Sequence, residues 1–244
     1  MLELTFLGSA NAFCPDGRYW SSFLLNDRYL FDAPPTVLPH LKRLKKDPSD
    51  ISAIFISHFH ADHFLGLPFL ILDYAYSSRR REDLQIIGPP GSRTFLEEFY
   101  ETCYPGLSAK QGGYQRLYTE VQAGRTEMAG QLSYQAFAVL HGEKLHCFGY
   151  RVELEGLALA YTGDAQYSEA IEEMARDVDV LVMDCTYRES GADHMGFPDV
   201  LELRRRLPAS TTLVLTHREA DHEIGQLENV VLAQDFATFR FPSP

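Results

Sequence analysis

Short apolar runs rich in Val, Ile, Leu and Phe alternate with amphipathic stretches along the whole chain. The runs predict strands over residues 4–8, 22–26, 28–32, 53–57, 84–88, 132–140, 148–154, 157–164, 178–186, 211–217 and 230–241. Helical spacing of apolar residues predicts helices over residues 36–46, 64–76, 92–100, 169–176 and 198–206. Residues 107–130 read as a loop. Each half begins with strands and interleaves helices later, which predicts two packed β-sheets with helices outside.

Length and composition are those of an ordinary globular protein. The chain has 244 residues, 45% hydrophobic and 23% charged, so we expect one α/β domain over residues 1–244. It opens directly on a strand-like run, and no apolar stretch approaches the roughly 18 residues of a membrane span. We therefore expect a cytoplasmic protein that does not engage a membrane. No CxxC pair occurs, and free thiols are expected at Cys14, Cys103, Cys147 and Cys185.

The charge is strongly acidic. Twenty-two basic and 34 acidic residues give a net charge of −12, which opposes non-specific attraction to nucleic acid or anionic lipid. Three basic runs, at residues 42–46, 79–81 and 204–206, are the places where a phosphate backbone could be gripped. Cations at helix ends more often complement the helix dipole and stay hydrated, and this is the interpretation that we favour for the three basic runs.

The motif H-x-H-x-D-H places four potential metal ligands within six residues, namely His58, His60, Asp62 and His63. It follows the apolar run of residues 51–56, so it stands where a buried strand ends. Imidazole and carboxylate together suit divalent ions such as zinc, manganese or iron. An extended H-x-H pair sends both rings to one face, and a turn can aim the next two side chains at a second point. The motif therefore predicts two neighbouring metal ions.

Three further donor residues follow apolar strand runs in the same way. His141 comes after the run of residues 132–140, Asp164 after 157–163, and His217 after 211–216. This recurrence predicts that all three side chains join the first cluster. His40, His146 and His222 lack this placement and are expected to be ordinary core or surface histidines.

This constellation resembles the metallo-β-lactamase superfamily, whose fold is a four-layer αβ/βα sandwich. The resemblance implies that one ion is held by His58, His60 and His141. It implies that the second ion is held by Asp62, His63 and His217, with Asp164 bridging the two. Zinc is the expected metal, and manganese or iron also suit these ligands.

Within the superfamily, the chain looks most like ribonuclease Z and related phosphodiesterases. The segments "LTFLGSANAF", "HGEKLHCFGYRV", "DCTY" and "LAQDF" carry this likeness. It implies catalytic roles for Asp62, for Asp184 in "DCTY" and for His194 in "ADHMG", and it suggests a homodimer. Three features depart from ribonuclease Z: the glycine-rich loop is reduced to "GSANAF", the "GHS" segment has become "DHM" at His194, and no basic Gly/Pro-rich insert could serve as a tRNA-gripping arm. With the acidic charge, these departures disfavour RNA as the partner.

The expected function is that of a dinuclear phosphodiesterase. Two close divalent ions activate water between them, and they stabilise the charge that grows on a phosphodiester under attack. The substrate would be a small diester, a cyclic nucleotide or an RNA end. Fold and ligands do not determine the bond attacked, so tRNA 3′ endonuclease activity and ester, lactone or thioester hydrolysis are alternatives. A metal-binding scaffold without turnover is the alternative from outside the enzymes.

Overall fold

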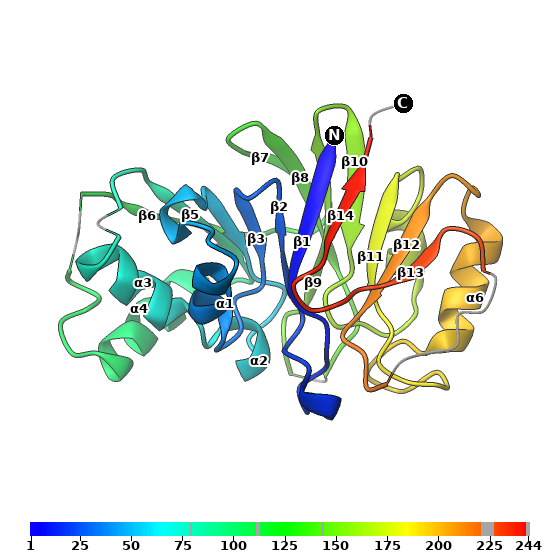
Figure 1. Ribbon diagram of the computed structural model, residues 1–244, viewed down its shortest axis with the longest axis horizontal. Coiled ribbons are helices and arrows are strands. Elements are labelled where there is room, and N and C mark those ends of the chain that lie inside the picture. The colour runs from blue at the N-terminus through cyan, green and yellow to red at the C-terminus, as the bar shows by residue number, and fades with distance from the viewer. Residues whose placement is uncertain (79, 111–112, 143, 221–226, 243–244) are drawn as a thin grey trace.

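Two seven-stranded sheets face each other at the centre of the molecule, and helices cover their outer faces (Figure 1). The computed structural model describes residues 1–78, 80–110, 113–142, 144–220 and 227–242. The predicted αβ/βα sandwich is therefore confirmed. No helix of these described residues is long and apolar enough to cross a membrane.

The first sheet holds most of the N-terminal half. Its strand order is β14-β1-β2-β3-β4-β5-β6. The strands are β1 (Leu2–Gly8), β2 (Ser22–Leu25), β3 (Tyr29–Phe31), β4 (Ala53–Phe55), β5 (Leu84–Gly88), β6 (Arg116–Glu120) and β14 (Thr238–Phe241). From β3 to β6 they run parallel. Apolar residues of its outer face pack under α1 (Val37–Arg43), α3 (Leu67–Tyr76) and α4 (Ser92–Cys103).

The second sheet comes from the C-terminal half, in the order β13-β12-β11-β10-β9-β8-β7. Its strands are β7 (Thr126–Ala129), β8 (Leu132–Ala138), β9 (Phe148–Leu154), β10 (Leu157–Tyr161), β11 (Val180–Asp184), β12 (Thr212–Thr216) and β13 (Val230–Leu232). The strands β10 to β13 are parallel to one another. Helices α5 (Glu169–Met174) and α6 (Phe197–Arg206) cover its outer face.

Aromatic side chains fill the space between the sheets. Phe31 stacks on Phe23 and on Phe55, with ring centroids 4.6 and 4.8 Å apart, so one ladder runs across β2, β3 and β4. From the second sheet, Tyr134 and Tyr150 meet the Phe55 ring edge-on at 5.3 and 5.2 Å. Such stacked and edge-on pairs stabilise the core beyond the hydrophobic effect, and they favour one relative arrangement of the two facing sheets.

Three predicted segments are wrong in part. The segment 107–130, expected as a loop, carries β6 and β7, which are short, half-exposed edge strands with little apolar patterning. The single strand expected over residues 230–241 is two strands in different sheets, β13 and β14. The helix expected over residues 64–76 is divided into α2 (Ala61–Phe64) and α3, because Gly66 and Pro68 interrupt it.

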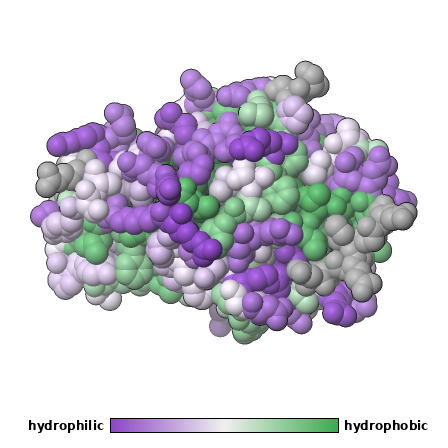
Figure 2. Space-filling model, viewed as in Figure 1, coloured by the Kyte–Doolittle hydropathy of each residue, from purple (hydrophilic) through white to green (hydrophobic). Residues whose placement is uncertain are grey.

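The topology gathers the ends of many strands at one edge. Strands β4, β10, β11 and β12 end at the edge that carries α2, low in Figure 1, while both termini lie at the opposite edge. The face of the molecule seen in this view is covered mainly by hydrophilic side chains, with hydrophobic ones showing between them near its middle (Figure 2). Functional side chains are expected at the carboxyl ends of parallel strands.

Candidate metal centre

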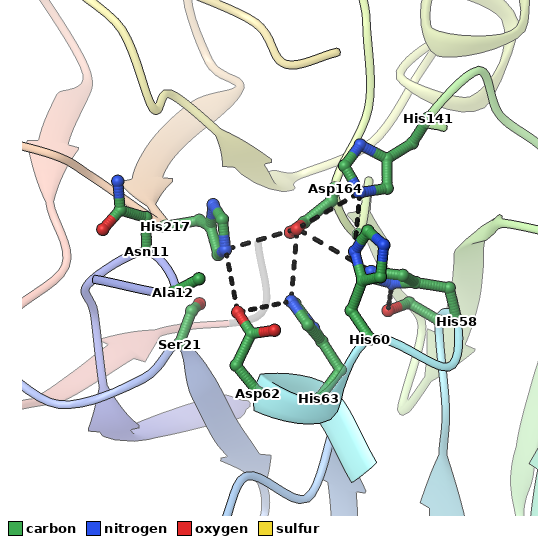
Figure 3. A network of polar contacts seen from close by, with 12 residues as sticks. Asn11, Ala12, Ser21, His58, His60, Asp62, His63, His141, Asp164 and His217 are labelled. Carbon is green, nitrogen blue, oxygen red and sulfur yellow. Dashed lines mark hydrogen bonds and ion pairs between the residues drawn. The ribbon is translucent and has the colours of Figure 1, made fainter. Parts of the chain in front are cut away.

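All seven predicted ligands lie at this edge, in loops or in the short helix α2, and they come from both halves of the sandwich (Figure 3). The segment after β4 contributes His58 and His60, and α2 contributes Asp62 and His63. On the other side, the ligand candidates that follow β8, β10 and β12 are His141, Asp164 and His217. Each half of the sandwich therefore contributes part of one cluster.

One group consists of His58, His60, His141 and Asp164. One ligand-type atom from each of them lies within 4.8 Å of those of the others. Nε2 of His141 faces Nδ1 of His60 at 3.0 Å, and Nε2 of His58 lies 3.9 Å from Oδ2 of Asp164. Three imidazole nitrogens and a carboxylate oxygen at such distances suit a tetrahedral divalent ion.

A second group consists of Asp62, His63 and His217, again within 4.8 Å of one another. Oδ2 of Asp62 lies 3.4 Å from Nε2 of His63 and 3.6 Å from Nε2 of His217. Asp164 stands between the groups, because its Oδ2 is 3.2 Å from both of these nitrogens. The predicted division of ligands between two ions matches these two groups in composition, while the binding of metal by them stays a prediction.

The hydrogen bonding of the rings fits a metal better than it fits a closed polar core. Nε2 of His58, of His63 and of His217 is buried without a hydrogen-bond partner. Leaving a buried polar atom unpaired costs about 1–3 kcal/mol, so three such atoms aimed at one carboxylate require a partner. A divalent cation suits this donor set of neutral imidazoles and carboxylates.

In the buried histidines among the ligand candidates, the opposite ring nitrogens are all held by neighbouring groups. Nδ1 of His58 pairs with Ser57 Oγ at 2.9 Å, and Nδ1 of His141 lies 2.7 Å from the backbone carbonyl of Asp193. His217 Nδ1 meets Thr186 Oγ1 at 2.9 Å. Such outer contacts orient metal-ligating imidazoles and direct the Nε2 lone pair inward.

Asp32 is a part of the site that sequence reasoning missed. This fully buried carboxylate accepts hydrogen bonds from the Ser57 amide and hydroxyl, and from Tyr161 Oη at 2.7 Å. Its Oδ2 also lies 2.8 Å from Nδ1 of His63. A signal was available, since Asp32 directly follows an apolar strand run as the ligands do.

Burial and charge set the protonation of the ligands. Desolvation lowers the pKa of His58 well below its usual range, which keeps that ring neutral. Burial alone would raise the pKa of Asp164, but the neighbouring His217 and His63 hold it well below its usual range. Burial would lower the pKa of His63, but Asp164 and Asp32 raise it well above its usual range, so a metal ion would have to displace the proton of that ring.

The predicted catalytic pair, Asp184 and His194, is brought together beside the cluster. Nδ1 of His194 lies 2.7 Å from Asp184 Oδ2, and its ring stacks on that of His217 with centroids 5.1 Å apart. Burial disfavours a charged ring, but the bond to Asp184 outweighs it and raises the pKa of His194 to about 9. The pair can therefore hold a proton next to the candidate metal centre.

The remaining histidines and the cysteines are placed as expected where the structure describes them. His40 packs against the rings of Tyr19 and Phe236, and His146 is exposed. His222 lies outside the described residues. All four cysteines are free thiols.

Known proteins align with nearly the whole of this chain. Ribonuclease Z of Methanosarcina mazei is 27% identical over 303 aligned positions that span 99% of each chain. Ribonuclease Z of Bacillus subtilis is 23% identical, also over 99% of each. Human tRNase Z, short form, superposes with a TM-score of 0.78 at 24% identity, covering 99% of this chain and all of its own.

A solved diphosphatase from the PhnP family has the same fold. It superposes with a TM-score of 0.77 at 20% identity, covering 99% of this chain and 98% of its own. A family profile described as a beta-lactamase superfamily domain matches residues 27–218, a range that includes all seven ligand candidates. The chain therefore belongs to the metallo-β-lactamase superfamily and is a hydrolase.

Proposed function

We propose that this hydrolase is a dinuclear metal-dependent phosphodiesterase that acts on small diesters. The observation that carries the proposal is the gathering of two ligand groups around Asp164 next to the Asp184–His194 pair. The first provides sites for two ions, and the second provides a proton for a leaving group.

Two divalent ions, with zinc the expected metal, supply Lewis-acid activation of water and of the ester under attack. His58, His60 and His141 would hold the first ion, and Asp62, His63 and His217 would hold the second, with Asp164 placed to contribute to both. Burial of Asp164 keeps this carboxylate at one position between the two groups. Asp62 is the more exposed of the two carboxylates, with 14% of its side chain accessible against 3% for Asp164.

The Asp184–His194 pair favours esters that have a poor leaving group. Asp184 fixes the His194 ring through Nδ1, so the ring's second proton sits on Nε2. An alkoxide that leaves a phosphodiester is strongly basic and gains from such a general acid. Thioester hydrolysis expels a weakly basic thiolate and depends less on such an acid, which places thioesters second.

The surface charge supports a small substrate over a long polyanion. Lys42 pairs with Asp73, and Lys46 pairs with Asp27. In the third basic run, Arg205 and Arg206 pair with acidic residues, and Arg204 donates to backbone carbonyls. Paired cations attract a phosphate backbone less than free ones do.

A tRNA 3′ endonuclease is the second candidate, because the matched relatives are named ribonuclease Z. Their alignment with this chain is longer than the chain itself, 303 positions against 244 residues, so the relative carries segments without a counterpart here. This difference agrees with the expected lack of a tRNA-gripping arm.

A panel of substrates separates the candidates. Zinc-loaded protein is incubated with bis(p-nitrophenyl) phosphate, with 2′,3′-cyclic nucleotides, with a lactone and thioester set, and with a 3′-extended tRNA precursor. Preferential turnover of the diesters, lost in Asp164→Ala, supports the proposal. Preferential cleavage of the tRNA precursor supports the second candidate, and turnover of lactones or thioesters alone contradicts both.

A further inference from the structure

Thr186 stands between the ligand candidate His217 and the Asp184–His194 pair. It follows β11, and its side chain is 2% exposed. Its Oγ1 lies 2.7 Å from Asp184 Oδ1, 2.9 Å from His217 Nδ1 and 2.8 Å from the His217 carbonyl oxygen. One buried hydroxyl therefore contacts both parts of the site.

The single proton of this hydroxyl decides which His217 nitrogen is a donor. A threonine hydroxyl carries one proton and two lone pairs. Its two oxygen neighbours, Asp184 Oδ1 and the His217 carbonyl, can only accept, so the proton is directed to one of them. Oγ1 then faces His217 Nδ1 with a lone pair, and Nδ1 must donate. A neutral His217 ring therefore carries its proton on Nδ1 and its lone pair on Nε2.

This tautomer is the one that a metal ligand needs. Nε2 of His217 is buried without a hydrogen-bond partner and points at Asp164 Oδ2, 3.2 Å away. The backbone of His217 also needs stabilisation, because its φ of 55° is left-handed and this conformation is unfavourable for a residue other than glycine. The hydrogen bond from the Glu219 amide to the Thr186 carbonyl stabilises that turn.

The contacts of Thr186 also complete a continuous chain. Nδ1 of His194 donates to Asp184 Oδ2, Asp184 Oδ1 accepts from Thr186, and Thr186 accepts from His217. Each member is buried or half-buried, where hydrogen bonds polarise one another. The orientation of the acid and that of the ligand ring are thus coupled through one hydroxyl.

We propose that Thr186 is a positioning residue that selects the metal-binding tautomer of His217 and ties it to the Asp184–His194 pair. The inference rests on the proposed metal centre, but it does not depend on which ester is the substrate. It predicts that losing the hydroxyl, rather than losing the side-chain volume, weakens the ion held by Asp62, His63 and His217.

Two substitutions at one position test this. Thr186→Val keeps the shape and removes the hydroxyl, while Thr186→Ser keeps the hydroxyl. Thr211→Val is the matched control, because Thr211 is also buried and donates to a backbone carbonyl, that of Val178, at the far end of β12. Zinc affinity is measured by competition with a chromophoric chelator. Thr186→Val should weaken one of two ions about ten- to a hundredfold, with Thr186→Ser and Thr211→Val close to wild type.

A spectroscopic readout follows the proton itself. In the cobalt-loaded protein, proton NMR shows the exchangeable imidazole N–H signals of the metal ligands, and histidine ¹⁵N labelling identifies them. The His217 Nδ1–H should be protected in wild type, exchange faster in Thr186→Val and recover in Thr186→Ser.

Several results overturn the inference. Unchanged zinc affinity in Thr186→Val does so, as does an equal loss in Thr211→Val. If Thr186→Val does not fold, the wild-type spectrum decides, because an unprotected His217 Nδ1–H contradicts the role of Thr186. Failure of the proposed function would be distinguishable from failure of this inference. In that case the zinc-loaded wild-type protein would cleave no diester, while the zinc affinities and the N–H protection would still differ between the variants as expected.

Discussion

Asp32 contacts several of the residues that support the candidate metal centre. The carboxylate is fully buried, and its four close contacts come from Ser57, His63 and Tyr161. Burying a charge is costly unless it is hydrogen-bonded, so these donors and Asp32 depend on one another. By holding Nδ1 of His63, Asp32 determines where Nε2 of that ring points.

Replacing Asp32 with asparagine should therefore weaken metal binding. The amide keeps the shape but loses the charge that orients His63, and the loss of such a support typically costs about ten- to a hundredfold in metal affinity. Zinc competition with a chelator measures the effect. Asp73→Asn is the control, because Asp73 is also buried and charged but pairs with Lys42 on the outer helices. Equal affinities of Asp32→Asn and wild type would contradict this role.

His194 should matter most for substrates whose leaving group needs a proton. His194→Gln is expected to lower kcat by about 10²–10⁴ on alkyl phosphodiesters. The loss should be smaller on bis(p-nitrophenyl) phosphate, whose leaving group is a weak base. Steady-state kinetics on both substrates, with zinc content measured in parallel, provide the comparison. The same loss on both esters, or loss of zinc, would show that His194 acts in another way.

The ligand candidates could be predicted from sequence, while the contacts that support them could not. His58 to His63 form a local motif, and His141, Asp164 and His217 share the strand-end pattern. The contacts of Asp32 with Tyr161 and of Thr186 with His217 join residues far apart in the chain. Such pairs depend on how strands are ordered across and between sheets, which no local pattern encodes.

At the scale of elements, Gly163 lets β10 end directly against the first sheet. Its φ is 59°, and a Cβ there would lie 2.8 Å from Ser57 Cβ and 3.1 Å from the Phe148 carbonyl. Both neighbours belong to the junction of the sheets, where the Phe148 amide donates to the Ser57 carbonyl. The close approach brings Asp164 to the ligands of the first sheet.

Gly163→Ala should destabilise the protein by roughly 2–4 kcal/mol, through left-handed strain and overpacking together. Gly156→Ala separates the two causes, because Gly156 has φ 77° with no atom near the added methyl group. This control should lose only about 1 kcal/mol. Urea unfolding in the presence of a chelator measures both without a contribution from metal. Equal losses would mean that the close approach is not tight.

Two of the wrongly predicted segments have different physical causes. The run over residues 230–241 looks continuous, but a turn with Phe236 at φ 64° lies between β13 and β14 and moves the chain to the other sheet. β6 and β7 are edge strands whose exposed side chains leave no alternation to detect. Buried strands, such as β5, were predicted with correct bounds because their apolar side chains are required on both faces.

The whole molecule carries a net charge of −12, and many of its basic side chains are engaged by acidic ones. We therefore expect weak binding of tRNA, no tighter than the non-specific range of about 10⁻⁴–10⁻⁶ M near physiological salt. Fluorescence anisotropy with a labelled tRNA precursor at about 50 and 200 mM salt tests this. Tight binding that falls steeply with salt would favour the tRNA endonuclease instead.

A zinc titration of the metal-stripped protein tests the central claim most directly. Bound zinc per chain and hydrolysis of bis(p-nitrophenyl) phosphate are followed in the same samples, for wild type and Asp164→Ala. We expect two ions per chain, with turnover that rises until the second site fills and that is lost in the variant. A chain that binds a single ion, or turnover that does not depend on metal, would contradict a dinuclear phosphodiesterase centre.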